Sequence, residues 1–323
     1  MRVLIAGTGG VGGYYGARLA AGGHDVRFLA RGPMLEALRS DGLVLLADLG
    51  DVRIDHVHAT DRLDPGDAPA EAVLFTVKTY DDAEAADAIA PAVAQDTIVC
   101  SLQNGVDNET FLQERFPQAT VLGATSRIET FVERPGVVAQ RGRQSEVTIG
   151  AFVEEERPAA AHLGKALDDS GVPVTLVSDI RSALWQKLVV ISGLGGVTAY
   201  AGATIGEVLA DPNLDRLFRD VLDETETVAR ALGIAVPDGI AGIVHAYAAN
   251  SLDPSFLSSM TRDVRRGKPL EVESLNGAVV RYGATAGVPT PGNERVVAEL
   301  LPRHRAALAA RSERADQPPA PTR

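Results

Sequence analysis

The sequence predicts a doubly wound α/β domain with a parallel sheet, followed by an all-helical domain. Three observations support this prediction. Short apolar runs alternate with helical stretches up to Asp179, which is typical of strand–helix–strand units. A glycine motif, Gly7–Gly12, lies between the first apolar run and the first helical stretch. From Ile180 onward the strand pattern gives way to apolar residues at helical spacing. With 323 residues, the chain is long enough for two domains.

The elements of the first domain follow in order. Val3–Ala6 is a strand, a helix rich in alanine and glycine extends to about Ala21, and Asp25–Ala30 is a second strand. Leu43–Leu46 and Val52–Val57 are expected to form a hairpin. The later strands share short apolar runs: Glu71–Val77, Thr97–Leu102, Val121–Ala124, Val137–Ala139, Val147–Phe152 and Val174–Val177. Helices are expected over Asp81–Ala92 and Arg157–Ser170.

The second domain is expected to consist of helices only. We place the domains at residues 1–179 and 180–310, with a disordered tail over 311–323 because that segment lacks apolar residues and is rich in proline. Asp211-Pro212 indicates a helix start, and Gly233 and Gly287 indicate helix ends. Apolar residues at helical spacing mark four helices: Arg181–Ser192, Asn213–Leu232, Gly239–Asn250 and Glu271–Gly287. The long apolar helices Val221–Leu232 and Val296–Leu308 could serve a subunit interface.

Composition excludes several classes of function. The chain has 31 basic and 43 acidic side chains and a formal net charge of −12, which argues against a general nucleic-acid or anionic-membrane binder. There is no apolar run long enough to span a membrane, and the first residues do not resemble a secretory signal. A single cysteine, Cys100, excludes an intramolecular disulfide. We therefore expect a soluble, cytoplasmic protein. His56 and His58 are close in sequence, but no third ligand has metal-site spacing, so no metal is expected.

The glycine motif predicts a dinucleotide site. Gly7-Thr8-Gly9-Gly10-Val11-Gly12 has the G-x-G-x-x-G pattern, directly after a strand and at the start of a helix. In such a turn Gly7 permits the tight bend, Gly9 lets a pyrophosphate approach the backbone, and Gly12 allows close helix–strand packing. The helix N-terminus offers N–H groups and a positive dipole end to the phosphates. A tight turn without a ligand is the simpler alternative.

The end of the second strand predicts the type of dinucleotide. An NAD site usually has an acidic residue there, which binds the ribose 2′-hydroxyl. This sequence has Arg31 instead, and a guanidinium suits a 2′-phosphate. NADP(H) is therefore favoured, although Arg31 could also be a solvated loop residue.

Two more segments follow predicted strands, where open α/β sheets bind ligands. Lys78 lies in Thr76-Val77-Lys78-Thr79 and could contact the cofactor ribose or phosphates. Asn104 lies in Ser101–Gly105 and could contact the nicotinamide or a substrate. Asn104-Gly105 is also a common turn dipeptide without any binding role.

These segments and others together resemble the ketopantoate reductase family over about residues 1–305. The resemblance rests on the glycine motif with Arg31, Val77-Lys78-Thr79, Gln103-Asn104-Gly105, Trp185–Leu188, Val197-Thr198-Ala199, Ser258-Ser259-Met260 with Asp263, and Glu271 with Asn276-Gly277. It implies an NADPH-dependent 2-dehydropantoate 2-reductase, which forms pantoate for pantothenate biosynthesis. It also implies an N-terminal Rossmann-type domain, a C-terminal helical domain for substrate binding and dimerisation, and often a homodimer.

The resemblance also assigns roles to particular residues. Lys187 matches the catalytic lysine, and Glu271 matches its acidic partner and a cofactor contact. Ser259 matches a substrate-binding serine, and Asp263 an acid of the same segment; Asn104 is placed with the substrate as well as the cofactor. The chemistry agrees, because reduction of a ketone leaves alkoxide charge that an ammonium group can stabilise and protonate. A nearby carboxylate keeps such a lysine protonated.

Simpler explanations exist for these same residues. A lysine on a helix, such as Lys187, is often only a solvated charge. Ser258-Ser259 could be a helix cap. Glu271 follows Pro269 and could merely favour the first turn of a helix.

One departure from the family pattern concerns the substrate. Ile191 and Gly195 lie one and two helical turns after Lys187, where pantoate-forming enzymes usually have asparagines. Neither residue can replace those donors, although Ser192 could do so if the helix ends early. The main hypothesis is therefore reduction of 2-dehydropantoate. The alternatives are a family paralogue acting on another small keto or hydroxy acid, and a non-catalytic protein that senses NADP(H).

Overall fold

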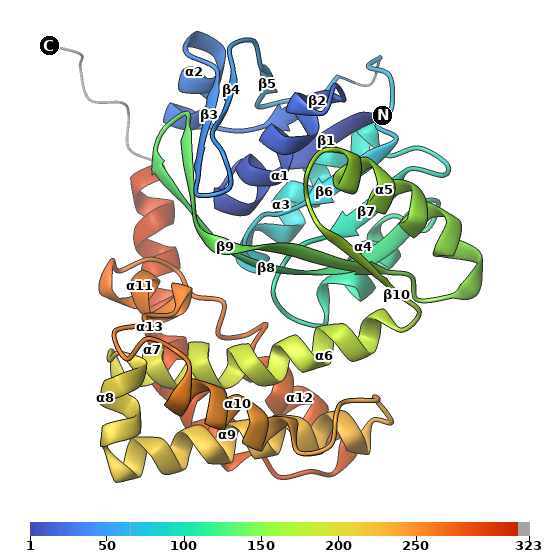
Figure 1. The fold of residues 1–323 in the computed structure, drawn as a ribbon. Coiled ribbons are helices and arrows are strands. Elements are labelled where there is room, and N and C mark those ends of the chain that lie inside the picture. The colour runs from blue at the N-terminus through green and yellow to red at the C-terminus, as the bar shows by residue number, and fades with distance from the viewer. Residues whose placement is uncertain (65, 316–323) are drawn as a thin grey trace, which may run out of the picture. The chain divides into compact units, whose positions relative to one another are not determined.

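The computed structural model describes residues 1–64 and 66–315. The chain divides into two compact units, Met1–Leu184 and a second that begins at Trp185 (Figure 1). The division lies within helix α6 (Ile180–Ile191), a few residues after the boundary expected at Asp179. In the part of the chain that is described, every helix is too short or too polar to cross a membrane.

The first unit is built on one large mixed sheet, as the alternation of strands and helices predicts. Across the sheet, its strands are β4 (Val52–Ile54), β3 (Leu43–Ala47), β9 (Val137–Gly150), β8 (Thr120–Arg134), β7 (Ile98–Ser101), β6 (Ala72–Phe75), β1 (Arg2–Ala6), β2 (Asp25–Leu29) and β5 (His58–Thr60), with β10 (Val174–Val177) paired to β9. The predicted hairpin is present as the antiparallel pair β3–β4.

From β5 across the sheet to β8, each adjacent pair of strands is parallel. The chain leaves β1 towards β2 on one side and later returns to β6 on the other, so the strand order reverses at β1. In a doubly wound sheet, a ligand binds outside the carboxyl ends of the strands at this reversal. The ends of β1, β2 and β6 are thus where the fold itself places a cofactor.

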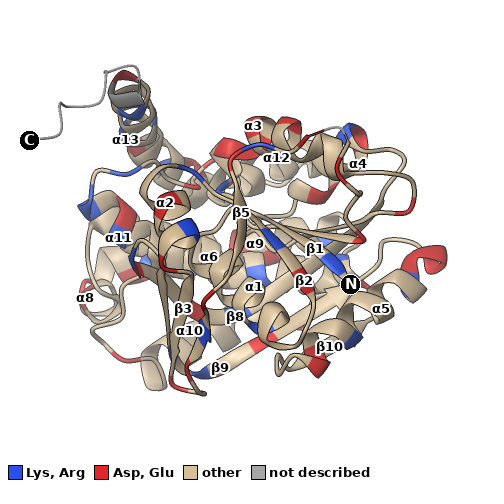
Figure 2. Ribbon diagram, turned by 90° about the horizontal axis from the view of Figure 1, so that it is seen from above, with Lys and Arg blue, Asp and Glu red and all other residues tan. Residues whose placement is uncertain are grey.

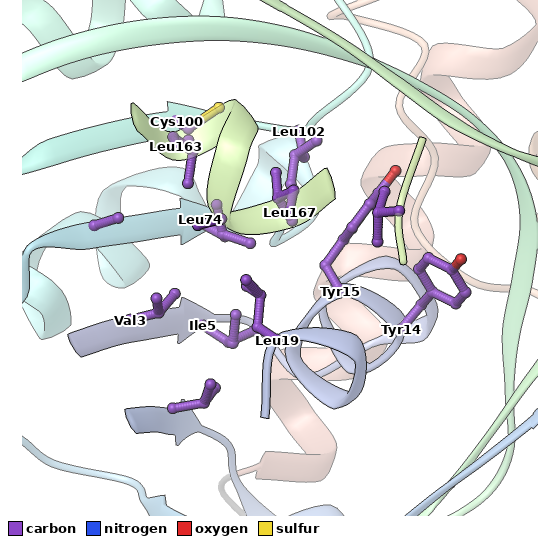
Figure 3. Packing of buried hydrophobic residues seen from close by; sticks show 14 of the residues in the cluster. Val3, Ile5, Tyr14, Tyr15, Leu19, Leu74, Cys100, Leu102, Leu163 and Leu167 are labelled. Atoms are coloured by element: carbon purple, nitrogen blue, oxygen red, sulfur yellow. The ribbon is translucent and has the colours of Figure 1, made fainter. Parts of the chain in front are cut away.

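Helices cover both faces of this parallel sheet, because alternate residues of each strand face opposite sides. Val3 and Ile5 of β1 pack into one apolar cluster, whereas Leu4 and Ala6 pack into another. Figure 3 shows the first cluster, in which Val3, Ile5 and Leu74 lie near side chains of two helices. Each large side chain removed from water in this way contributes about 1.5–3 kcal/mol.

The helices divide between the two clusters. The first cluster receives α1 (Gly10–Ala21), α2 (Gly32–Ser40) and α5 (Arg157–Asp169), and the second receives α3 (Asp82–Ile89) and α4 (Asn108–Arg115). Single 3₁₀ turns lie at η1 (Thr79–Asp81), η2 (Ala90–Ala92) and η3 (Glu154–Glu156). The sequence predicted α1, α3 and α5, but not α2 or α4.

The expectation of three short strands between Val121 and Phe152 was wrong. The structure has two long antiparallel strands, β8 and β9, with bulges that interrupt their register. The first part of β8 and both ends of β9 are buried, but the rest of β8 and the middle of β9 are largely exposed and carry polar residues such as Arg127 and Arg141. Because those positions have no apolar alternation, sequence periodicity detects only the buried ends.

The second unit consists of helices in its described part, as predicted. After α6 and a π-helical segment, η4 (Ser192–Val197), come α7 (Thr198–Ala201), α8 (Ile205–Ala210), α9 (Pro212–Ala231), α10 (Ile240–Asn250), α11 (Ser259–Arg265), α12 (Asn276–Ala286) and α13 (Pro291–Ala315). Asp211 caps α9 as expected, because its carboxylate accepts the N–H of Asn213 at 2.8 Å. Phe218, Leu222 and Val228 of α9 are fully buried.

Two boundaries in this unit differ from expectation. Residues 271–275 form turns, and the helix starts only at Asn276, because Leu275 has a non-helical backbone conformation. At the other end, α13 continues to Ala315, so residues 311–315 are helical and not a disordered tail. Acidic and basic positions are interspersed along α13 (Figure 2). Ion pairs at helical spacing, such as that between Arg303 and Glu299, stabilise a helix even where apolar residues are lacking. The rest of the expected tail, 316–323, lies outside the described residues.

Candidate active site

The glycine turn after β1 is so tightly packed that neither Gly7 nor Gly12 could carry a side chain. Gly7 has a φ of +97°, and a Cβ there would lie 2.7 Å from Cγ1 of Val77. A Cβ on Gly12 would lie 2.1 Å from the Gly7 carbonyl oxygen. The Thr76 hydroxyl donates to the carbonyl oxygens of Ala6 (2.9 Å) and Gly7 (2.7 Å). The end of β6 therefore fixes the turn that follows β1.

Gly9, in contrast, faces open space. Within the described residues, a Cβ on Gly9 would meet no atom within 4 Å. Gly9 is the N-cap of α1, and among those same residues no side chain caps the helix and none in its first turn is acidic. Free N–H groups, a positive helix end and unfilled space together suit a phosphate group. A dinucleotide phosphate could therefore approach the backbone at Gly9 without a steric clash.

The other motif residues hold the turn in place. The buried Thr8 hydroxyl donates to the Leu29 carbonyl at the end of β2, at 3.2 Å. Gly10 lies against β8, because a Cβ there would be 2.9 Å from the Thr130 carbonyl oxygen. Val11 packs on the core from the first turn of α1. The turn is therefore joined to three neighbouring strands before any ligand binds.

Arg31 is the N-cap residue of α2, two residues after β2 ends. Its guanidinium forms an ion pair with Glu84 of α3, which sequence reasoning missed. Both side chains are about half exposed, so this ion pair contributes little to the stability of the fold. A 2′-phosphate at Arg31 would compete with Glu84 for the same donors.

Lys78 and Asn104 lie in the turns after β6 and β7, and Gln103 joins these turns. The Gln103 amide donates to the Val77 carbonyl at 2.9 Å and to Asp82 at 2.6 Å. The Asn104 carbonyl accepts from the Asn108 amide at 3.1 Å. Within the first unit, the turns carrying the predicted cofactor residues thus follow neighbouring strands and are cross-linked. The bridging role of Gln103 has no signal in the sequence beyond its place in the motif.

Glu109, at the start of α4, is a buried acid that sequence reasoning missed. It is 2% exposed, and no hydrogen bond of standard geometry from the described residues reaches either carboxylate oxygen. Burial raises the pKa of Glu109 to about 8, and repulsion from Asp107 and Asp82 adds to this shift. Its own backbone N–H and the Ser101 side chain act in the opposite direction, but less strongly.

In the second unit, Lys187 is partly buried on α6. Two residues earlier, Trp185 packs edge-on against Tyr282 of α12, with ring centroids 5.4 Å apart. The helix does not end after Ile191 but continues as the π segment η4. Ser192 cannot supply the missing donor, because its hydroxyl bonds to the Val189 carbonyl (3.2 Å) and to Thr225 of α9 (3.0 Å).

Ser259 is the exposed first residue of α11, and its neighbour Ser258 is the helix cap. The Ser258 hydroxyl accepts the Thr261 N–H at 3.0 Å and lies 3.0 Å from the Thr198 hydroxyl. The cap explanation is therefore correct for Ser258 but not for Ser259. Asp263 lies one turn further along α11 and is partly buried.

Glu271 is 7% exposed and lies in the turns before α12 rather than in a helix. This segment is anchored on both sides of Glu271. The Leu270 N–H donates to His304 of α13 at 2.9 Å, and the Asn276 amide donates to the Ser192 carbonyl at 3.1 Å. Asn276 therefore ties the Glu271 segment to the helix that carries Lys187.

The predicted site residues thus form two groups. The glycine turn, Arg31, Lys78 and Asn104 belong to the first unit, and Lys187, Ser259, Asp263 and Glu271 belong to the second. Within the described ranges, no three His, Cys, Asp or Glu side chains are arranged to hold a metal ion. His56 lies in a bend and His58 in β5, so they do not share one strand.

Comparison with known proteins agrees with these features. Residues 3–154 match the family model of ketopantoate reductase PanE/ApbA, and residues 179–303 match the model of its C-terminal part. The 2-dehydropantoate 2-reductase of Halobacterium salinarum is 32% identical over 293 residues, which cover 90% of this chain and 95% of that protein.

Two solved structures are also similar over most of the chain. The PanE/ApbA family ketopantoate reductase from Ralstonia eutropha is 34% identical, with a TM-score of 0.86 over 95% of this chain and all of the other. The 2-dehydropantoate 2-reductase from Geobacter metallireducens is 27% identical, with a TM-score of 0.85 and the same coverage. The chain belongs to the ketopantoate reductase family of oxidoreductases.

Proposed function

We propose that this chain catalyses the NADPH-dependent reduction of a 2-oxoacid ketone to a 2-hydroxy acid. The glycine turn carries the proposal: Gly7 and Gly12 are closed by packing, while Gly9 keeps its space open at the start of α1. Arg31 supports NADPH over NADH, because a guanidinium at the end of β2 suits a 2′-phosphate. Lys78 and Asn104 are proposed to contact the cofactor from the neighbouring turns.

The second unit is proposed to supply the acid chemistry and the substrate contacts. When bound, the nicotinamide supplies hydride to the ketone carbon. Lys187 stabilises the resulting alkoxide and gives it a proton, and Glu271 keeps the lysine protonated and oriented. Ser259 and Asn104 position the substrate, with Asp263 in the same segment as Ser259.

The first substrate to test is 2-dehydropantoate, which the names of the relatives specify. Its product would be pantoate, an intermediate of pantothenate biosynthesis. The cytoplasmic location and the homodimer expected from the sequence are part of the same proposal. A second candidate, a family member acting on another small keto acid, is favoured by Ile191 and Gly195, which carry no polar side chain after Lys187.

The test is NADPH oxidation with 2-dehydropantoate and a panel of other 2-oxoacids, measured for the wild type and Lys187→Ala. We expect Lys187→Ala to lower kcat by roughly 10²–10⁴-fold, as for loss of a general acid, with NADPH binding retained. Lys165→Ala is the matched control, because Lys165 is exposed on α5 and pairs only with neighbouring Asp169 in the described contacts. NADPH binding without turnover of any 2-oxoacid would support a sensing protein instead.

A further inference from the structure

The π segment η4 contains three buried glycines, and packing requires only two of them. A Cβ on Gly193 would lie 2.5 Å from Leu222 and 2.8 Å from Phe218 of α9. A Cβ on Gly196 would lie 2.4 Å from the side-chain oxygen of Asn276. Real Cβ atoms do not approach other atoms so closely, so neither position tolerates a side chain without a shift of its neighbours.

Gly195 differs from both. Among the described residues, the one atom within 4 Å of a Cβ placed there is the Met260 methyl carbon, at an ordinary contact distance of 3.8 Å. The backbone at Gly195 is not left-handed, so its conformation does not demand glycine either. Gly195 is nevertheless buried. The missing side chain at Gly195 therefore leaves room for at least a methyl group that the packing of the helices does not fill.

The π turn directs this space towards the face of Lys187. On an uninterrupted α-helix, residues advance by about 100° each, so Gly195 would stand about 80° away from Lys187. A π turn, with bonds from i to i+5, takes about one residue more than an α turn. Because η4 begins directly after Ile191, Gly195 is rotated back towards the line of Lys187 and Ile191.

The side-chain contact at Gly195 is apolar, and the hydroxyl groups nearby already bond to each other. Thr198, Ser258 and Thr261 form one buried hydroxyl cluster, with distances of 2.7–3.0 Å between their oxygen atoms. The Ser258 hydroxyl also lies 3.5 Å from the Gly195 carbonyl oxygen. Met260, in contrast, is 4% exposed and directs its thioether methyl to Gly195.

We propose that Ile191, Gly195 and Met260 form a subsite for the side chain of the substrate, and that the preferred substrate is a 2-oxoacid with a branched or aromatic hydrocarbon side chain. This inference rests on the proposed reductase function and narrows its substrate class. A hydroxyl group on the side chain, as in 2-dehydropantoate, would be buried there against a methyl group and an aliphatic chain. Such a group loses its bonds to water without gaining a partner.

A matched pair of substrates tests the subsite in the wild-type enzyme. 2-Dehydropantoate and 3,3-dimethyl-2-oxobutanoate differ only in that a hydroxyl of the first is a hydrogen in the second. We expect kcat/KM with NADPH to be roughly 10–100-fold higher for 3,3-dimethyl-2-oxobutanoate, which is the discrimination an apolar pocket achieves against an added hydroxyl. Equal values, or a preference for 2-dehydropantoate, would overturn the subsite but leave the reductase function intact. Failure to reduce either acid or any other 2-oxoacid would overturn both.

Two variants test the assigned residues. Gly195→Asn should lower the preference for the hydrocarbon substrate by at least about 10-fold, because it adds an amide donor and fills the space. Gly242→Asn is the matched control, since Gly242 lies on α10 and a Cβ there meets no described atom within 4 Å. An unchanged substrate ratio in Gly195→Asn, with wild-type NADPH binding and melting temperature, would remove Gly195 from the subsite.

Discussion

Replacing Glu109 by glutamine should stabilise the protein at alkaline pH, and the difference from the wild type should grow as pH rises. The folded-state pKa of Glu109 is about 8, against an ordinary value of 4.5, because its carboxyl is buried. Between these two pH values the unfolded chain loses the proton while the folded chain keeps it. Stability is therefore lost as pH rises from about 4.5 to about 8, and the loss stays constant above that.

The size of this effect follows from the pKa difference. Each unit is worth about 1.4 kcal/mol, so the shift from 4.5 to about 8 costs at most about 5 kcal/mol at alkaline pH. Glutamine does not titrate, so the variant avoids this loss. Its buried amide has no hydrogen-bond partner, however, which costs about 1–3 kcal/mol. We expect Glu109→Gln to be about 2 kcal/mol more stable than the wild type at pH 8.5, and about 1–3 kcal/mol less stable at pH 4.5, where only the amide cost remains.

The assay is urea unfolding of the wild type and Glu109→Gln at both pH values. Glu114→Gln is the matched control, because Glu114 lies on the same helix but is exposed. If the difference between Glu109→Gln and the wild type were the same at pH 4.5 and pH 8.5, Glu109 would not carry the proton assigned to it, and the reasoning from burial would fail.

Three further predictions concern the cofactor turn, the arginine and the π segment. Gly12→Ala should weaken NADPH binding at least about 100-fold in fluorescence titrations, because its methyl would meet a turn carbonyl at 2.1 Å. Arg31→Ala should weaken NADPH roughly 10-fold more than NADH, whereas Glu84→Gln should tighten NADPH by releasing the guanidinium; equal losses for both cofactors in Arg31→Ala would contradict the 2′-phosphate role. Gly193→Ala should cost about 1–3 kcal/mol of unfolding free energy and Gly195→Ala less than about 1, so similar losses would refute the contrast in packing.

Local patterns predicted most of the first unit. The strands β1, β2, β6 and β7, the glycine turn and the place of Arg31 all depend on neighbouring residues, and the structure has each of them where expected. The long ribbon β8–β9 could not be predicted, since its exposed middle depends on pairing between distant segments and not on apolar alternation. The late start of α12 depends likewise on the distant anchor between Asn276 and Ser192.

The sequence indicated where the candidate residues lie, but not which residues they contact. Glu84 is 53 residues from Arg31, and neither residue carries a pattern that indicates the other. Glu109 looks like an ordinary acid in the first turn of a helix, and only the fold shows that it is buried. The π segment has no separate signal either, because its apolar residues and glycines also suit an α-helix.

The π segment has a consequence for how this helix could change during evolution. A π turn is equivalent to one residue inserted into an α-helix, so deletion of one residue from η4 could restore regular α-helical bonding. Positions after η4 would then keep their direction relative to Lys187 and their neighbours, because an α turn covers the same rotation as a π turn with one residue fewer. Deletion of the residue after Gly195 would therefore place Leu194 in line with Lys187 in place of Gly195, without any substitution and without disturbing the helices that follow.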